Sequence, residues 1–414
     1  MKKLLAMLLC LAMLATGVFV LAACNNNKGD DKTYDIKVWV GEYTDELTRK
    51  QIAKFNETNE WGVTFNATVE VVSEKVAVGD ASAKAESAAD LFCFVQDNLA
   101  RAVRVNLLAP LNNASLTDIE QNHTESAVEA AKIGGTIRAF PMTSDNAFFM
   151  YYDKSVITDA THLTSLEALL ADCEAANKTF AMDLSSAGGS AWYAESFFYA
   201  TGCKSDWTTG NDGSFTAYDD TFNSANGEIA LKGIKKVVSS KAYLESCDAG
   251  ALSRGSAVVI SGIWDYTVAK DILKDNLGVA ALPSFTVDGT SYQLVSNFGH
   301  KFMGIKPQSD SYKALYLQKL AMYLTSAECQ LERFNTVAWI PTIKSLQDNA
   351  DVKASPCLAA IQNTKLVLQG QYPSNWWSVM ATMVGKVRGS EETGFGDLLA
   401  DYAKELPSLK VSAD

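Results

Sequence analysis

The sequence predicts an α/β fold with a largely parallel sheet, divided between two domains. Short apolar segments with a two-residue period alternate with longer segments of helical period. This alternation is typical of sheets whose parallel strands are joined by helices. The chain has 414 residues, and a single hydrophobic core rarely grows beyond about 250–300 residues. Two domains in one chain are therefore expected.

The first expected elements lie within residues 36–111. They are, in order, a strand at 36–40, a helix at 44–56, a strand at 63–72, a short helix, a strand at 91–95, and a helix through Leu99 and Val103. Ligands of such sheets bind beyond the carboxyl ends of the strands. Residues 41–43 and 96–98 are therefore candidate binding segments on position alone.

The later part of the chain is predicted to be richer in helix. A hairpin is expected at 133–140, where two adjacent glycines allow a tight turn. Further strands are expected at 148–152, near 257–260 and near 279–282. The sequence contains no internal repeat.

The N-terminus predicts export. Lys2 and Lys3 precede an apolar run from Leu4 to Ala23, which ends in small residues and then Cys24. The segment 21–24 resembles the lipobox of bacterial lipoproteins, which implies cleavage before Cys24 and acylation of its thiol. Residues 1–23 are then a signal peptide and 24–32 a flexible tether. The alternative is an uncleaved membrane helix, because twenty apolar residues span a bilayer.

Charge and cysteine content narrow the function. The net charge is −12 and lysines and arginines form no stripe, which argues against a nucleic-acid partner. Beyond Cys10 and Cys24 no C-x-x-C pair suggests a zinc or redox motif. The oxidising compartment of an exported protein permits disulfides. For the remaining six cysteines two states therefore stay open, namely free buried thiols or one or two disulfide bridges. These cysteines are Cys93, Cys173, Cys203, Cys247, Cys329 and Cys357.

Six segments together resemble the bacterial extracellular sugar-binding proteins of ABC importers, in particular the maltose/maltodextrin-binding branch. They lie in the same order along nearly the whole mature chain: Asp90–Asp97 followed by Leu108–Leu111; Phe140-Pro141 before Tyr152-Asp153-Lys154; Gly262–Tyr266; Leu282-Pro283 with Val287–Gly289; Thr325–Glu328; and Trp339-Ile340-Pro341.

The resemblance implies a two-lobed fold of the periplasmic-binding-protein type (type II), with discontinuous lobes joined by hinge segments. The N-terminal lobe would take residues 33–143 and 297–340, and the C-terminal lobe residues 144–296 and 341–414. The implied function is capture of an oligosaccharide, a maltodextrin, by lobe closure on the outer side of the cytoplasmic membrane. Its partners would be permease subunits with a separate ATPase. No cofactor or metal is expected. The protein is expected to be a monomer.

The resemblance also implies a set of ligand-binding residues. Flat aromatic side chains match the apolar faces of sugar rings, and carboxylates accept hydrogen bonds from the hydroxyls. The implied contacts are Trp192, Tyr193, Trp264, Tyr266 and Trp377 of the second lobe, Glu42, Phe94 and Asp97 of the first, and Asp145 at the boundary between them. The family usually has Trp, a basic residue and Glu where this chain has Phe94, Asn98 and Asp145.

Other interpretations of these residues stay open. An aromatic side chain is more often part of a core, and Trp39, Trp61, Trp207 and Trp339 are interpreted as packing. Asp97 and Asp145 could instead cap helices. An enzyme such as a two-carboxylate glycoside hydrolase is the main rival. The chain lacks G-x-S-x-G, H-E-x-x-H and phosphate-loop motifs. A xylo-oligosaccharide, a disaccharide or a polyamine would be alternative ligands of the same fold.

Overall fold

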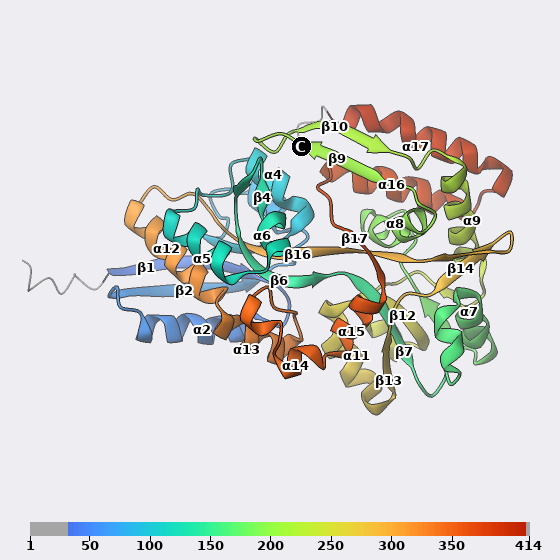
Figure 1. The fold of residues 1–414 in the computed structure, drawn as a ribbon, viewed down its shortest axis with the longest axis horizontal. Helices are drawn as coiled ribbons and strands as arrows, with labels where there is room; N and C mark the ends of the chain where they lie inside the picture. The colour runs from blue at the N-terminus through green and yellow to red at the C-terminus, as the bar shows by residue number, and fades with distance from the viewer. Residues whose placement is uncertain (1–31, 411–414) are drawn as a thin grey trace, which may run out of the picture.

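The computed structural model describes residues 32–410, so the predicted signal peptide, most of the predicted tether and Cys24 lie outside the described residues. Two separate sheets organise the chain, in agreement with the predicted α/β class with two lobes (Figure 1). We call the part built on the six-stranded sheet the first lobe and the part built on the five-stranded sheet the second lobe.

The first sheet has the order β17-β16-β3-β1-β2, and β6 also pairs with β16. Strands β1, β2 and β3 are parallel, whereas β16 runs antiparallel to β3 and β6. The bounds are β1 Lys32–Val40, β2 Val63–Val71, β3 Leu91–Val95, β6 Phe140–Asn146, β16 Val295–Ile305 and β17 Lys365–Leu368. The first helices of this lobe are α2 Asp45–Thr58, α3 Ala77–Ala83, α4 Leu99–Arg104, α5 Asn113–Asn122 and α6 Glu125–Ala130; α12 Ser311–Leu324 and α13 Ala327–Val337 follow β16.

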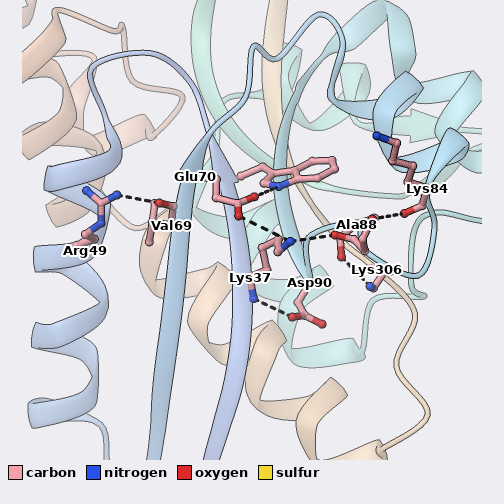
Figure 2. Close-up of polar contacts among 10 residues, drawn as sticks. Lys37, Arg49, Val69, Glu70, Lys84, Ala88, Asp90 and Lys306 are labelled. Carbon is pink, nitrogen blue, oxygen red and sulfur yellow. Dashed lines mark hydrogen bonds and ion pairs between the residues drawn. The ribbon is translucent and has the colours of Figure 1, made fainter.

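Polar side chains join the first three strands on the outer face of this sheet (Figure 2). The backbone N–H of Lys37 donates to Asp90 at 2.9 Å, and the Trp39 indole N–H donates to Glu70 at 2.9 Å. The ammonium of Lys37 lies 3.7 Å from the same Glu70 carboxylate. These contacts fix β1 against β2 and against the segment that leads into β3.

The second sheet has the order β11-β8-β12-β7-β13. The bounds are β7 Phe148–Asp153, β8 Thr179–Ala181, β11 Tyr243–Leu244, β12 Ser256–Gly262 and β13 Leu277–Ala280. The helices of this lobe are α7 Leu166–Ala175, α8 Ala191–Ala200, α9 Ala225–Ser239, α10 Gly250–Ser253, α11 Tyr266–Leu273, α14 Ala350–Lys353, α15 Pro356–Asn363, α16 Ser374–Val387 and α17 Phe395–Leu409. Three hairpins complete the fold: β4 Lys132–Ile133 with β5 Thr136–Ile137, β9 Ser205–Thr209 with β10 Phe215–Asp220, and β14 Ser284–Val287 with β15 Thr290–Gln293.

Apart from β17, which comes from the second-lobe part of the chain and pairs with the second-lobe end of β16 at Val295–Phe298, the chain passes between the lobes at three places. The first is between β6 and β7, at Ala147, and the second is β16, which extends from the second lobe into the first sheet (Figure 1). The third follows α13, near Ile340. At the second-lobe end of β16, Ser296 accepts a hydrogen bond from the Phe148 N–H at 2.8 Å. The first two passages are therefore bonded to each other.

The expected early elements are found, with β1 starting four residues earlier than predicted. Strand β16 was not predicted at all. The six cysteines that the structure describes are all free, which decides between the two states left open by the sequence. No helix within residues 32–410 has the length and apolarity that a membrane span needs.

Candidate functional site

Two of the predicted tryptophans lie together on the second lobe. Trp192 is the second residue of α8 and Trp377 the fourth of α16, and their ring centroids are 6.1 Å apart at an angle of 52°. Both side chains are half-buried, so each keeps exposed surface. Trp377 rests on Tyr372 and on the fully buried Trp376, with ring centroids 5.0 and 4.9 Å away.

Trp376 explains why this pair is rigid. Its indole N–H donates to the Tyr402 hydroxyl at 2.9 Å, and that hydroxyl donates to Asp220 at 2.7 Å. Tyr372 stacks on Trp376 at 4.4 Å between ring centroids. The partly exposed Trp377 ring is thus supported from below by a satisfied, buried aromatic layer.

Trp264 belongs to the same surface. It follows β12, and its indole lies against the backbone of Gly262, where a Cβ atom would come within 2.1 Å of the ring carbon Cζ3. Gly262 is paired with Phe148 across β12 and β7, and the Phe148 ring centroid is 6.0 Å from that of Trp192. Trp264 is therefore linked to Trp192 and Trp377 through the Gly262 backbone and the buried Phe148 ring.

Tyr266, at the start of α11, is also half-buried. Between it and Trp264 lies Asp265, which sequence reasoning did not select. Asp265 accepts hydrogen bonds from the Ser261 hydroxyl at 2.6 Å and from the Ala249 N–H at 3.0 Å. Burial raises the pKa of the Asp265 carboxyl, and the negative charge of Glu42 adds to the effect.

The charge of Glu42, a first-lobe residue, acts on Asp265 of the second lobe. Glu42 is exposed in the segment after β1, as predicted from its position beyond the strand. A second pair gives the same arrangement, because the ammonium of Lys75, after β2, counteracts the burial that raises the pKa of Cys247. Lys75 and Cys247 were not selected from the sequence, since single residues of these types carry no local signal.

Asp97 lies at the third of these strand ends, in the segment after β3. Its side chain is half-buried, and burial raises its pKa to about 6. It does not cap α4, whose N-cap is Asn98. Burial raises the pKa of the Glu195 carboxyl of α8 well above its usual range, and the negative charge of Asp97 raises it further.

Three of the nine predicted contacts are corrected by the structure. Phe94 is 0% exposed, because all five side chains of β3 are buried, and it packs against Phe92 and Phe302. Tyr193 is 5% exposed and its hydroxyl is hydrogen-bonded to Cys247 and Ser261. Both belong to the core beneath the surface rather than to the surface itself.

Asp145 is the third correction. It is 0% exposed and accepts hydrogen bonds from the Thr143 hydroxyl at 2.6 Å and the Ile340 N–H at 2.7 Å. Its carboxylate joins two passages of the chain, and its complete burial keeps it out of reach of a ligand. The six residues that remain as candidates are Glu42, Asp97, Trp192, Trp264, Tyr266 and Trp377.

Surface hollows also occur away from these residues. One of about 450 Å³ lies at β1 and β2 of the first sheet, beside Lys37 and Asp90; these two residues are labelled in Figure 2. Another of about 410 Å³ lies beside Trp61 and Lys319. Neither is lined by any of the nine predicted residues. Trp61 itself is 39% exposed, which corrects its interpretation as a packing residue.

Known structures with the same fold are numerous. A maltodextrin-binding protein of L. casei BL23, solved without ligand, superposes with a TM-score of 0.74 at 22% identity, covering 92% of this chain and all of its own. The GacH receptor of Streptomyces glaucescens, solved unliganded and with acarbose, gives 0.74 at 19%, covering 93% and 100%. A maltose/maltodextrin-binding domain of Bdellovibrio bacteriovorus bound to maltotriose gives 0.71 at 17%, covering 90% and 100%.

At these identities the likeness concerns the fold. No match was found among curated proteins. The family model described as bacterial extracellular solute-binding protein matches residues 50–360, which is most of the chain. That description implies a place outside the cytoplasm and a binding rather than a catalytic role. The chain is a member of the bacterial extracellular solute-binding protein family.

Proposed function

We propose that this protein is a lipid-anchored binding protein that captures a maltodextrin-like oligosaccharide and delivers it to an ABC importer. The observation that supports the proposal is the group of half-buried tryptophans on the second lobe, Trp264, Trp192 and Trp377, which are linked through Gly262 and Phe148. A pyranose ring has apolar C–H faces, which flat aromatic rings match, and such a surface suits an oligosaccharide longer than one ring.

The acidic residues supply the complementary contacts. Glu42 is exposed and Asp97 half-buried, and both come from the first lobe. Carboxylates accept hydrogen bonds from sugar hydroxyls, and such charge-assisted bonds are stronger than neutral ones. The aromatic faces would thus bind the sugar faces from one lobe while the carboxylates bind the hydroxyl edge from the other.

This division between lobes gives the mechanism. A ligand that contacts both lobes binds the closed conformation better than the open one, and so shifts the population toward closure. The importer's permease would then recognise the closed form, while a separate ATPase supplies the energy. The solved relatives named above that bind maltotriose or acarbose support the choice of ligand.

Anchoring by acylation of Cys24 is part of the same proposal. The segment 21–24 ends an apolar run and is followed by polar residues, as expected for a processed lipoprotein. One acyl chain gives only marginal membrane binding, so a multiply acylated cysteine is required for stable anchoring. The mature chain would then stay at the outer face of the cytoplasmic membrane.

The test is calorimetry on Trp192→Ala, Trp264→Ala and Trp377→Ala with maltotriose and maltoheptaose. Parent affinity is expected to be micromolar, about −8 kcal/mol, and each variant is expected to lose at least tenfold while its circular dichroism is unchanged. Trp61→Ala is the matched control, because this indole is exposed far from the surface. Parent-like binding by all three variants would refute the site.

The ligand class is tested separately. A thermal-shift panel of maltodextrins, xylo-oligosaccharides, disaccharides and spermidine reports binding through the rise in apparent stability. Stabilisation by xylo-oligosaccharide alone would refute the maltodextrin assignment and keep the fold-level role. Chromatography of maltoheptaose after incubation distinguishes capture from hydrolysis, since a hydrolase would release shorter products.

A further inference from the structure

The end of the first lobe where β1 begins carries exposed aromatic and apolar side chains. Trp61 is 39% exposed, Tyr312 57% and Leu315 41%, which makes three of the eight large apolar side chains exposed within residues 32–410. Tyr312 and Leu315 lie one turn apart on α12. Single exposed apolar residues are ordinary, whereas a group of them marks an interaction surface.

Two lysines lie over these aromatic rings. The Lys32 ammonium is 3.5 Å from the centre of the Tyr312 ring, and the Lys319 ammonium is 4.8 Å from that of Trp61. We call these five residues, Lys32, Trp61, Tyr312, Leu315 and Lys319, the basal patch. The hollow of about 410 Å³ beside Trp61 adjoins it, lined in part by Phe55, Met322 and Tyr323. Glu60 and Asp310 are exposed nearby.

The patch lies where the proposed anchor must emerge. Lys32 is the first residue of β1, and its N–H donates to the carbonyl of Gly62, the neighbour of Trp61. Seven residues separate Cys24 from Lys32. Even a fully extended chain of this length reaches at most about 30 Å. If Cys24 is acylated, the basal patch is therefore held close to the lipid.

We propose that the basal patch rests on the anionic phospholipid surface of the membrane and orients the anchored protein. Trp and Tyr favour the membrane–water interface because one side of the ring is apolar and the other polar. Lysines near an anionic surface are attracted to it. The inference rests on the proposed acylation of Cys24.

Overall charge adds to the orientation. Once it has lost Lys2 and Lys3 with the signal peptide, the chain carries a net charge of −14. Anionic lipid repels most of such a surface, and repulsion is strongest where acidic residues have no neighbouring lysines. The basal patch, with two lysines beside its apolar side chains and beside Glu60 and Asp310, is a face on which this repulsion is offset.

A permease is a less suitable partner for this patch. A protein that senses lobe closure must contact both lobes, whereas the basal patch belongs to the first lobe alone. It is also remote from the strand ends that face the second lobe. Helix α2 begins just after Tyr43 and ends just before Trp61, and its fourteen residues span about 21 Å.

The test is hydroxyl-radical footprinting of the acylated full chain in phosphatidylglycerol vesicles, read by mass spectrometry. The oxidation of Trp61 and Tyr312 is divided by that of Tyr43, which is 53% exposed at the other end of α2. The ratio cancels any radical scavenging by lipid. Relative to the unacylated Cys24→Ser chain in buffer, both ratios are expected to fall at least threefold. Unchanged ratios, or protection confined to the second lobe, would overturn the inference.

Charge reversal separates orientation from mere proximity. Lys32→Glu combined with Lys319→Glu keeps the anchor, and is expected to restore at least half of the lost oxidation on phosphatidylglycerol. If the double variant is protected as strongly as the parent, the lysines do not orient the chain. Protection seen only when the permease is reconstituted would assign the patch to that protein instead.

The outcomes distinguish this inference from the proposed function. An unmodified Cys24 peptide in the mass spectrum refutes the anchor, and the inference with it. A modified Cys24 with unchanged oxidation ratios refutes the inference alone. Failure to bind any glycan refutes the sugar proposal and leaves the orientation measurement valid.

Discussion

The Asp145 carboxylate accepts a hydrogen bond from the backbone N–H of Ile340 at 2.7 Å. These residues are 195 positions apart, and each lies at a passage between the lobes. Thr143 donates to the same carboxylate at 2.6 Å. The first and third passages are thus joined by a buried, charged acceptor. The position that family resemblance offered as a sugar contact serves the hinge.

Replacing Asp145 by Ala is expected to destabilise the fold. The change leaves the Ile340 N–H and the Thr143 hydroxyl without their acceptor in a site that is 0% exposed. An unsatisfied buried polar group costs about 1–3 kcal/mol, so urea unfolding should show a loss of about 2–4 kcal/mol for the pair. Asp348→Ala, whose side chain is 89% exposed, is the control and should change little. A parent-like Asp145→Ala would contradict the hinge role.

A buried ion pair lies beside this hinge. The Lys301 ammonium is 3.2 Å from Glu74 and 3.7 Å from the centre of the Trp339 ring, and its side chain is 3% exposed. Burial alone would lower the pKa of Lys301, but the charges of Glu74 and Asp145 raise it above the usual value. The raised pKa means that its contribution to stability is present throughout the neutral range and is lost only in strong alkali.

Lys301→Met should therefore be strongly destabilising, by about 3–5 kcal/mol, because it leaves buried carboxylates without a cation. Adding Glu74→Gln removes one of those charges, and the double variant is expected to be more stable than Lys301→Met alone. Urea unfolding of the four members of this cycle measures the coupling. A double variant as unstable as the sum of the two single changes would show that the pair is not coupled.

How far the sequence determines this structure depends on where polar residues lie. The early strands have apolar residues at every second position, and their positions were predicted to within a few residues. Strand β16 was missed because Ser296, Asn297, His300 and Lys301 interrupt its apolar pattern, although all four are at most 2% exposed. Their side chains have partners more than a hundred positions away, such as Glu195 for Asn297 and Ser144 for His300. No local pattern contains that information.

The candidate site was predictable to a similar degree. The strand-end rule located Glu42 and Asp97, and family resemblance supplied the tryptophans. Resemblance failed at Phe94 and Asp145, where this chain departs from the family residue and the side chain is buried in a core or a hinge. Asp265 was missed because its relation to Glu42 arises only when the two lobes face each other.

Asp97 predicts a pH dependence of both stability and binding. Its folded pKa of about 6 lies above the unfolded value of about 3.9, so the folded chain binds the proton more tightly. Stability therefore falls as the pH rises from about 4 to 6, and the loss is complete above that range. Asp97→Asn removes the loss and should be more stable than the parent at pH 7.5, by about 1–2 kcal/mol, with little difference at pH 4.

Lowering the pH should stabilise the fold through Asp97 but weaken the binding of sugar. If the Asp97 carboxylate accepts from a sugar hydroxyl, parent affinity for maltotriose falls below pH 6 as the group is protonated. Asp97→Asn should bind more weakly than the parent at pH 7.5 and show a flatter pH profile between 5 and 7.5. Calorimetry at several pH values checks this. An unchanged profile in the variant would remove Asp97 from the site.

Gly262 offers a test of Trp264 in which no aromatic residue is substituted. A Cβ atom at this position would lie 2.1 Å from the Trp264 ring, far inside contact distance, so Gly262→Ala must displace the indole. The backbone φ of Gly262 is −110°, which alanine adopts freely, so the change acts through contacts of the new Cβ, with the Trp264 ring first and with the Ala147 carbonyl oxygen, 2.6 Å away, second. Maltodextrin affinity is expected to fall at least tenfold, because stacking requires a fixed ring face.

The matched control is Gly394→Ala, since a Cβ atom there would meet nothing within 4 Å. It should bind like the parent. Intrinsic fluorescence would report the displaced indole of Gly262→Ala independently of ligand, and circular dichroism would confirm that the fold is retained. Parent-like affinity together with a shifted fluorescence spectrum would mean that Trp264 moves without consequence. The binding surface would then consist of Trp192 and Trp377 alone.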